Sequence, residues 1–303
     1  MRYEFWTADV FTDRVFGGNP LAVVPDASGL KPEQMQLIAR EFNLSNSTFV
    51  LPPESGDHNF RVRIFTPARE LPFAGHPTVG AACVLAAAGR VKLEGGEGKV
   101  VLGEGVGAIP VTIHGGGDKP YFAQLTAAML PQWGPSPPPS EMLAAMLSVD
   151  PTDVLDDTRD EPQAISCGVP FMFVPLASLE AVRRARLNWE WWNQYLSSHW
   201  APQVFLFAFE AETRGVTAHA RMFSPWAGVE EDPATGSAAA AFAGYLVRRE
   251  RPADGTARWM IEQGFEMGRP SFIQIEADVS DGKPGSVRVG GQTVLVTRGH
   301  IDA

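Results

Sequence analysis

A five-residue segment occurs twice in this chain, and the two copies have similar surroundings. Arg63–Pro67 (RIFTP) recurs as Arg221–Pro225 (RMFSP). After each copy come one or two acidic residues, then a glycine, and then a stretch of small apolar residues that predicts a helix. These helices are Thr78–Ala88 and Ala238–Val247. Self-similarity of this kind indicates that the chain consists of two similar units.

A weaker similarity lies upstream of each copy. Gly18–Pro25 (GNPLAVVP) resembles Gly168–Pro175 (GVPFMFVP), and in both places a candidate helix and then a candidate strand follow. The helices are Pro32–Phe42 and Trp189–His199, and the strands are Ser47–Leu51 and Val204–Phe209. Agreement in order and spacing favours a duplication, although proline and glycine recur in the loops of any protein.

Short strand signals separated by glycine-rich turns fill much of the remaining sequence. They lie at Tyr3–Phe11, Leu21–Val24, Phe60–Phe65, Lys99–Leu102, Ile109–Ile113, Tyr121–Leu125 and Gln292–Thr297. Many short strands with few helices predict an α+β protein with strongly curved, barrel-like sheets. The one low-complexity linker, Pro131–Pro139, separates the two predicted units.

Composition narrows the class of partner. The chain has 303 residues, enough for two domains, and a formal net charge of −10. An acidic protein is a poor partner for nucleic acid or an anionic membrane, but a local site can still bind a small anionic metabolite. With two cysteines, no zinc-ligand spacing, no signal peptide and a longest apolar run of only Ala81–Ala88, we expect a cytoplasmic protein without a metal.

The two glycine-led helices are the strongest candidates for a binding site. Both are apolar on every side, which predicts that they are buried. The first N–H groups of a helix lack partners within the helix and favour an anion, and a glycine lets a ligand approach them. Gly75 and Gly236 therefore predict a paired site for a carboxylate in one cleft. The alternative is that these glycines only permit tight packing of each helix against a strand.

Three polar residues beside these glycines are candidates for chemistry. His76 lies at a helix start, where a lowered pKa favours the neutral imidazole, although a packed histidine is equally expected. Asp232 could hold a substrate group or merely complement the helix dipole. Ser237 could bind ligand oxygens, but capping a helix is the commoner role. Cys83 is expected to be a small core residue rather than a nucleophile.

Six segments form a specific ordered set. They are Asp9–Thr12 (DVFT), Gly17–Pro20 (GGNP), Ala39–Ser45 (AREFNLS), Arg63–Pro67 (RIFTP), Leu71–Pro77 (LPFAGHP) and Glu231–Ala238 (EDPATGSA). Together they resemble the PhzF-like family of phenazine biosynthesis, from near residue 5 to near residue 300.

The resemblance implies a diaminopimelate epimerase-like fold of two pseudo-symmetric halves, each a barrel-like sheet around a central helix. The first half would be residues 1–120 with the C-terminal strand 288–303, and the second residues 121–287. It also implies a cofactor-independent isomerase, often a homodimer, whose best-known reaction moves a proton in a dihydro-hydroxyanthranilate. The site carried over is Ser45, Gly75, His76, Asp232, Gly236 and Ser237. The epimerase relatives have two cysteines at the helix starts, and their absence here disfavours a two-thiol mechanism.

The important departure from the family pattern is Asn46. The resemblance implies a glutamate at this position, which takes a proton from one carbon and returns it to another, whereas an amide has no such proton. Three alternatives remain open. Another group, His76 or Asp232, could carry out a different proton transfer, or the protein could bind a ligand without turning it over. Asn46 could also be an altered form of an ancestral glutamate that still binds substrate.

We therefore expect an isomerase that moves a proton on a small carboxylate-bearing metabolite, cyclic or amino acid-like. The alternative is a catalytically impaired or non-catalytic metabolite-binding protein on the same scaffold. A hydrolase that uses His76 and Ser237 is disfavoured because the sequence has no nucleophile elbow.

Overall fold

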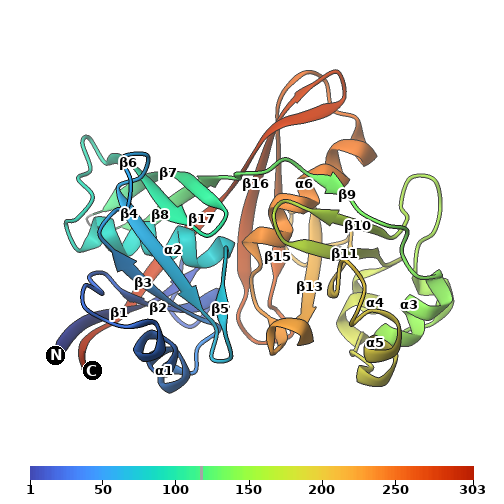
Figure 1. The fold of residues 1–303 in the computed structure, drawn as a ribbon. Coiled ribbons are helices and arrows are strands. Elements are labelled where there is room, and N and C mark those ends of the chain that lie inside the picture. The colour runs from blue at the N-terminus through green and yellow to red at the C-terminus, as the bar shows by residue number, and fades with distance from the viewer. Residues whose placement is uncertain (117–118) are drawn as a thin grey trace.

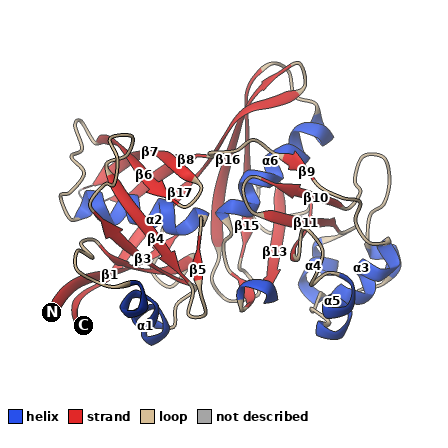
Figure 2. Cartoon of the chain, in the orientation of Figure 1, coloured by secondary structure: helices blue, strands red, loops and turns tan. Residues whose placement is uncertain are grey.

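A computed structural model of the chain describes residues 1–116 and 119–303. The described residues form two lobes that lie side by side, each with strands around a central helix (Figures 1 and 2). The elements of the first lobe are β1 (Arg2–Val10), β2 (Asn19–Val24), α1 (Pro32–Phe42), β3 (Asn46–Leu51), β4 (Phe60–Phe65), β5 (Glu70–Leu71), α2 (Gly75–Ala87), β6 (Glu97–Glu104), β7 (Gly107–Gly116) and β8 (Lys119–Thr126).

The remaining elements form most of the second lobe. They are β9 (Gln132–Trp133), α3 (Ser140–Leu147), the 3-10 turn Pro151–Asp153, β10 (Gln163–Ser166), β11 (Pro170–Pro175), α4 (Leu179–Arg184), α5 (Trp189–Tyr195), β12 (Gln203–Ala208), β13 (Ala218–Ser224), the 3-10 turn Pro225–Ala227, β14 (Val229–Asp232), α6 (Gly236–Glu250), β15 (Gly255–Gln263), β16 (Ser271–Ser280) and β17 (Lys283–Asp302).

Eight strands of the first lobe close into a mixed barrel. The ring runs β1, β2, β3, β4, β6, β7, β8, β17 and back to β1, with parallel pairs at β2–β3 and β4–β6. The buried helix α2 contacts seven of these strands, and its small side chains allow this close packing. The ring includes residues 121–126, which lie beyond the domain boundary predicted at residue 120.

The strands of the second lobe repeat this order of pairing. Their row runs β9, β10, β11, β12, β13, β15, β16, β17, with parallel pairs at β11–β12 and β13–β15. Helix α6 contacts β10, β11, β16 and β17. Phe242 of α6 packs on Phe173, Phe205 and Phe207, with ring centroids 4.6 to 5.6 Å apart.

A single long strand belongs to both lobes. The first part of β17 pairs with β16, its middle pairs with β8, and its last ten residues pair with β1. In Figure 1 β16 and β17 run between the lobes. The C-terminus thus lies beside the N-terminus, where Ala303 N–H donates to the Met1 carbonyl (2.8 Å).

Most of the predicted elements are confirmed, with shifted bounds. The helix Pro32–Phe42 is observed as predicted, while the helix predicted from Thr78 begins at Gly75. Within the Pro-rich linker, Gln132–Trp133 forms a short strand with β10, because the edge of β10 offers backbone N–H and C=O groups for pairing. Helices α3 and α4 were not predicted. No helix among the described residues is long and apolar enough to cross a membrane.

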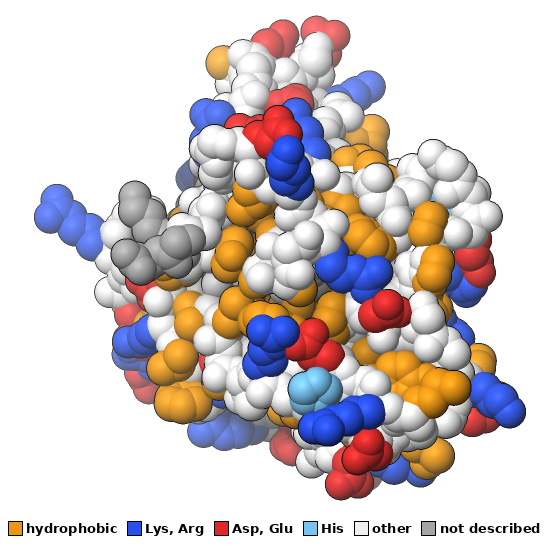
Figure 3. All heavy atoms as spheres, turned by 90° about the vertical axis from the view of Figure 1, so that its left-hand side faces the viewer, with side chains coloured by type: hydrophobic (Ala, Val, Ile, Leu, Met, Phe, Trp, Pro, Cys, Tyr) orange, Lys and Arg blue, Asp and Glu red, His pale blue; other side chains and the backbone are white. Residues whose placement is uncertain are grey.

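The surface of the first lobe carries no uniform charge. On the face shown in Figure 3, acidic and basic side chains alternate with apolar ones.

Both cysteines are buried free thiols, and burial raises the pKa of the Cys83 thiol to about 12. Cys83 is therefore an unreactive core residue, as predicted.

A buried carboxyl lies inside the barrel. Glu104 ends β6 and accepts a hydrogen bond from Thr78 Oγ1 of α2 (2.6 Å), while its Oε2 is buried without a partner among the described residues. Burial raises the pKa of Glu104 to about 8, against the opposing effect of the Thr78 hydrogen bond. The carboxyl is therefore mostly protonated at neutral pH.

We expect Glu104→Gln to change how stability depends on pH. Between the unfolded pKa near 4.5 and the folded pKa near 8, the folded chain holds a proton that the unfolded chain has released, so stability falls as pH rises. The amide removes this penalty, so the variant should match the wild type at pH 5 and exceed it by about 1–3 kcal/mol at pH 8.5. Urea unfolding at both pH values measures this difference, and equal stability at pH 8.5 would contradict it.

Candidate functional site

The starts of the two central helices touch each other. A Cβ built on Gly75 would lie 2.6 Å from the Cα and carbonyl carbon of Gly236, and one built on Gly236 would lie 3.1 Å from the Cα of Gly75. Only glycine permits this approach of two backbones. The glycines therefore permit close packing of one helix start against the other, and not the helix–strand packing expected as the alternative.

The first N–H groups of both helices are available to a ligand. Neither Ala74, the N-cap of α2, nor Thr235, the N-cap of α6, makes a side-chain capping hydrogen bond. The uncapped N–H groups and the two helix dipoles create positive potential at one point. Such a point favours a carboxylate or another small anion.

These helix starts open into a cavity of about 290 Å³ between the lobes. Its walls include every residue that the sequence singled out for the site. These are Ser45, Asn46, Gly75, His76, Asp232, Gly236 and Ser237. A cavity of this size suits a small metabolite rather than a polymer.

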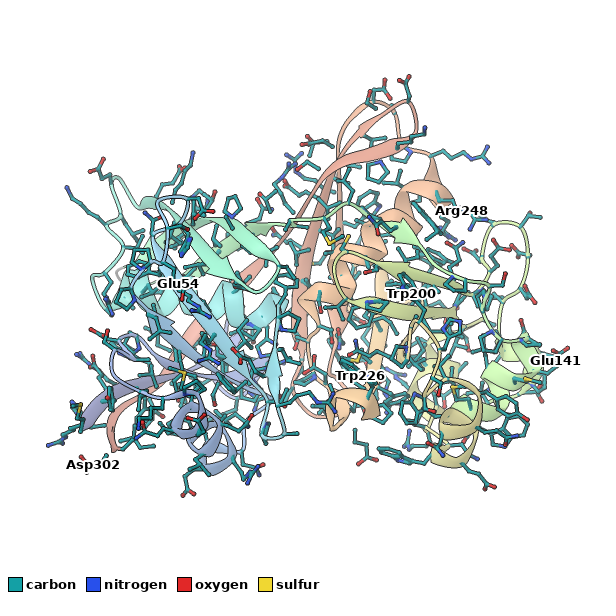
Figure 4. All side chains as sticks on the ribbon, viewed as in Figure 1. Glu54, Glu141, Trp200, Trp226, Arg248 and Asp302 are labelled. Atoms are coloured by element: carbon teal, nitrogen blue, oxygen red, sulfur yellow. The ribbon has the colours of Figure 1, made fainter. Side chains whose placement is uncertain are left out.

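The remainder of the cavity wall is largely apolar and aromatic. Sequence reasoning missed these residues, which include Phe73, Phe171, Trp200, Met222, Trp226 and Val229. Figure 4 shows Trp226 at the boundary between the lobes and Trp200 on the second lobe. Trp226 directly follows the second RMFSP segment, so the repeat itself was a signal for its position. Arg69, which follows the first copy, stacks on Trp226 with its guanidinium 4.9 Å from the ring.

His76 is a neutral group at this site. Its side chain is buried, and burial lowers the pKa of the imidazole to about 3. The lowered pKa was predicted from the position at a helix start, whereas the cause found in the structure is loss of solvent on burial. Its Nε2 is buried without a partner among residues 1–116 and 119–303. An imidazole with so low a pKa is a weak base at neutral pH.

Asp232 has a pKa better suited to proton transfer. Burial raises the pKa of its carboxyl to about 6, although hydrogen bonds from Thr235 and Asn19 lower it in part. Thr235 Oγ1 donates to Oδ2 (2.7 Å) and Asn19 Nδ2 donates to Oδ1 (2.8 Å). Asn19 begins β2 in the first lobe, so a residue of one lobe orients the carboxylate of the other. A carboxyl with this pKa can exchange a proton near neutral pH.

Asn46 occupies the cavity at the first position of β3. Its side chain is 6% exposed, and its Nδ2 donates a long hydrogen bond to the Phe65 carbonyl (3.4 Å). The amide is thus held by the barrel while it faces the cavity. It offers a hydrogen bond but no titratable proton. The two serines, Ser45 and Ser237, also line the cavity.

Gly75→Ala should disrupt the site through sterics alone. The new Cβ would meet the backbone of Gly236, which no side-chain rotation can relieve, so the helix starts must separate. We expect a loss of about 1–3 kcal/mol in the free energy of unfolding and loss of carboxylate binding in the cavity. Urea unfolding and calorimetric titration with benzoate measure the two effects. Gly56→Ala, whose Cβ would meet nothing within 4 Å, is the matched control; equal behaviour of the two variants would refute the steric argument.

Comparisons with known proteins agree with this geometry. Residues 8–299 match the family described as phenazine biosynthesis-like protein. An uncharacterized isomerase of Mesorhizobium japonicum is 43% identical, over 97% of this chain and 96% of the relative. A trans-2,3-dihydro-3-hydroxyanthranilate isomerase of Pseudomonas aeruginosa is 33% identical, over 98% and 99%.

Solved structures give the same result for the fold. The phenazine biosynthesis protein of the PhzF family from Bacillus anthracis is 25% identical and superposes with a TM-score of 0.89, each chain covered completely. A probable proline racemase from Agrobacterium radiobacter superposes with a TM-score of 0.65 at 12% identity, over 99% of this chain and 93% of that one, which shows a shared fold.

Proposed function

This chain belongs to the phenazine biosynthesis-like family, and from that membership we propose that it is a cofactor-independent isomerase. The reaction moves a proton on a small carboxylate-bearing metabolite, cyclic or amino acid-like. The observation that carries this proposal is the meeting of two uncapped helix starts at one cavity, next to a carboxyl whose pKa is about 6.

The helix starts would hold the carboxylate of the substrate. Backbone N–H groups at Gly75, His76, Gly236 and Ser237 lie at the helix starts, and the hydroxyls of Ser45 and Ser237 line the same cavity. Removal of a proton next to a carboxylate pushes negative charge onto its oxygens. Preorganised N–H donors stabilise that charge as it develops.

Asp232 would carry the proton. Its ionised carboxylate takes a proton from one carbon of the substrate, and the electron pair of the broken C–H bond shifts a double bond along the substrate. The carboxylic acid so formed returns the proton to a second carbon, which restores the carboxylate and balances the reaction. Neutral His76 would donate or accept a hydrogen bond without changing its charge.

Hydrogen exchange tests this assignment. In deuterated water we expect wild-type protein to place deuterium on at least one member of a panel of hydroxy- and amino-substituted cyclic carboxylates that includes trans-2,3-dihydro-3-hydroxyanthranilate. Because the base form of Asp232 is lost below its pKa of about 6, exchange should fall about tenfold per pH unit below that value. Asp232→Asn should lower the rate by about 10²–10⁴.

A carboxylate-to-amide change outside the cavity is the control. Asp278 lies on β16 and pairs with Arg288 on the barrel surface, so Asp278→Asn should exchange like the wild type. If the exchange rate of Asp232→Asn still fell below pH 6 as in the wild type, Asp232 would be ruled out as the proton carrier.

The alternative is a metabolite-binding protein without turnover, and Asn46 is the observation that favours it. A glutamate is the residue that the resemblance implies at this position, and the cavity around Asn46 is otherwise complete. In this case a carboxylate ligand stabilises the protein against heat, but no deuterium enters any member of the panel.

Asn46→Glu separates the two functions. If the remainder of the site is intact, the new carboxyl should raise turnover of trans-2,3-dihydro-3-hydroxyanthranilate by about 10²–10⁴ over the wild type, because it adds a general acid and base. Product formation followed by chromatography measures the change. A gain in the variant together with no exchange in the wild type would favour the binding protein; exchange in the wild type favours the isomerase.

The proposal also includes how the chain arose and assembles. We infer that the two lobes descend from a duplicated unit, with the boundary predicted at residue 120 moved to residue 126 because β8 belongs to the first barrel. The first unit is then residues 1–126 with 288–303, and the second is residues 127–287. The same order of parallel and antiparallel pairs in both rows of strands supports this. A homodimer is proposed from the resemblance, with no nucleic acid or membrane as partner.

A further inference from the structure

Two strands of the molecule begin with an amide side chain at the wall of the cavity. Asn46 is the first residue of β3, and Gln203 is the first residue of β12. Each side chain is 6% exposed and lines the cavity. Sequence reasoning identified Asn46 but not Gln203.

Strand register makes the two positions equivalent. Asn46 lies opposite Leu21 in the β2–β3 ladder, and Gln203 lies opposite Phe171 in the β11–β12 ladder. Leu21 and Phe171 are the fourth residues of the similar segments that begin at Gly18 and Gly168. The parallel ladders therefore place Gln203 in the second lobe where Asn46 lies in the first.

The antiparallel ladders lead independently to the same pair. Phe49 lies opposite Arg63, and Leu206 lies opposite Arg221, the first residue of the second repeated segment. Three residues back along each strand are Asn46 and Gln203. The agreement of two registers shows that the equivalence does not depend on the choice of one alignment.

The two amides face the cavity with opposite hydrogen-bonding groups. Gln203 Oε1 accepts from Ser224 Oγ (2.6 Å), which leaves its Nε2 as the donor. Asn46 uses its Nδ2 on the Phe65 carbonyl, which leaves its Oδ1 as the acceptor. Neither remaining atom has a partner in the part of the chain that the structure describes, and neither is sealed from the cavity. Each amide therefore has one unused group that water or a ligand in the cavity can satisfy.

We propose that Gln203 is a substrate-positioning residue, and that it and Asn46 bind two different polar groups of one substrate from the two lobes. Gln203 Nε2 donates to an acceptor oxygen of the substrate, and Asn46 Oδ1 accepts from a hydroxyl or amino group. The substrate class is thus a carboxylate that carries one donor and one acceptor beyond the carboxylate itself. This inference rests on the proposed function, since it assumes the carboxylate at the helix starts.

Titration calorimetry tests the assignment when the affinities of several benzoates are compared between the wild type and variants of the two amides. Benzoate supplies the carboxylate alone, the three methoxybenzoates add an oxygen that only accepts, and the three aminobenzoates add an N–H donor. At least one methoxybenzoate should bind the wild type about threefold to tenfold more tightly than benzoate, as expected for one hydrogen bond. Gln203→Met, which keeps the length of the side chain but has no donor, should abolish that preference.

A positioning role for Gln203 predicts that only some ligands lose affinity in the variant, whereas a structural role predicts that all of them do. Gln203→Met should change the affinity for benzoate and the aminobenzoates by less than about twofold, since one hydrogen bond is missing only for the methoxy ligands. Asn46→Leu should show the reverse, with loss of the aminobenzoate preference alone. Gln292→Met, on an exposed side chain of β17, is the control and should match the wild type.

Two results would overturn the role of Gln203 while they leave the carboxylate site standing. One is an equal loss of affinity for all seven ligands in Gln203→Met, and the other is a methoxy preference that survives in that variant. Failure of the wild type to bind any of the seven carboxylates would instead overturn the proposed function, and the role of Gln203 with it.

Discussion

The direct contact between Gly75 and Gly236 is the constraint on which the site depends. Two buried helices, one in each lobe, meet at their starts with backbone against backbone. Because every other residue type would add a Cβ into that contact, the sequence of both helix starts is restricted to glycine. The meeting point fixes where the lobes join, where the positive ends of the helix dipoles converge, and hence where an anion is stabilised. Side chains of both lobes around this point then form the walls of the cavity.

The sequence predicted which residues come together better than it predicted their surroundings. All seven residues taken from the repeats and motifs line one cavity, because the motifs flank the helix starts. Gln203 was missed because its relation to Asn46 appears only when strand registers are known. Trp200 was missed because the loop that carries it contains no periodic signal, whereas Trp226 could have been found from its place directly after the second repeated segment. The low pKa of His76 was predicted, yet its depth of burial could not be read from a short motif.

The fold was predicted at a similar level. Helix and strand positions followed from apolar periodicity, but the closure of the first barrel depends on pairing between β1 and β17, which lie at opposite ends of the chain. Local sequence carries little information about such distant pairing. The strand Gln132–Trp133 was hidden for a related reason, since prolines on both sides indicate a linker and only the neighbouring β10 makes a strand possible.

The site is also where the two lobes hold each other in place. Asn19 reaches from β2 to the carboxylate of Asp232 and to the Ala234 carbonyl, with both distances 2.8 Å. The pKa of the proposed proton carrier is therefore sensitive to how the lobes pack, because movement between them would change both its burial and this hydrogen bond.

The shared strand β17 has a consequence for biosynthesis. The first barrel closes only when residues 293–302 pair with β1, which the ribosome makes long before them. During translation the nascent first lobe therefore has two unpaired strand edges, on β1 and β8, until β17 emerges. Such open edges can pair with other chains, so the nascent chain is vulnerable to aggregation in the period before β17 emerges. The long sequence separation of these contacts also favours slow folding, which extends that period.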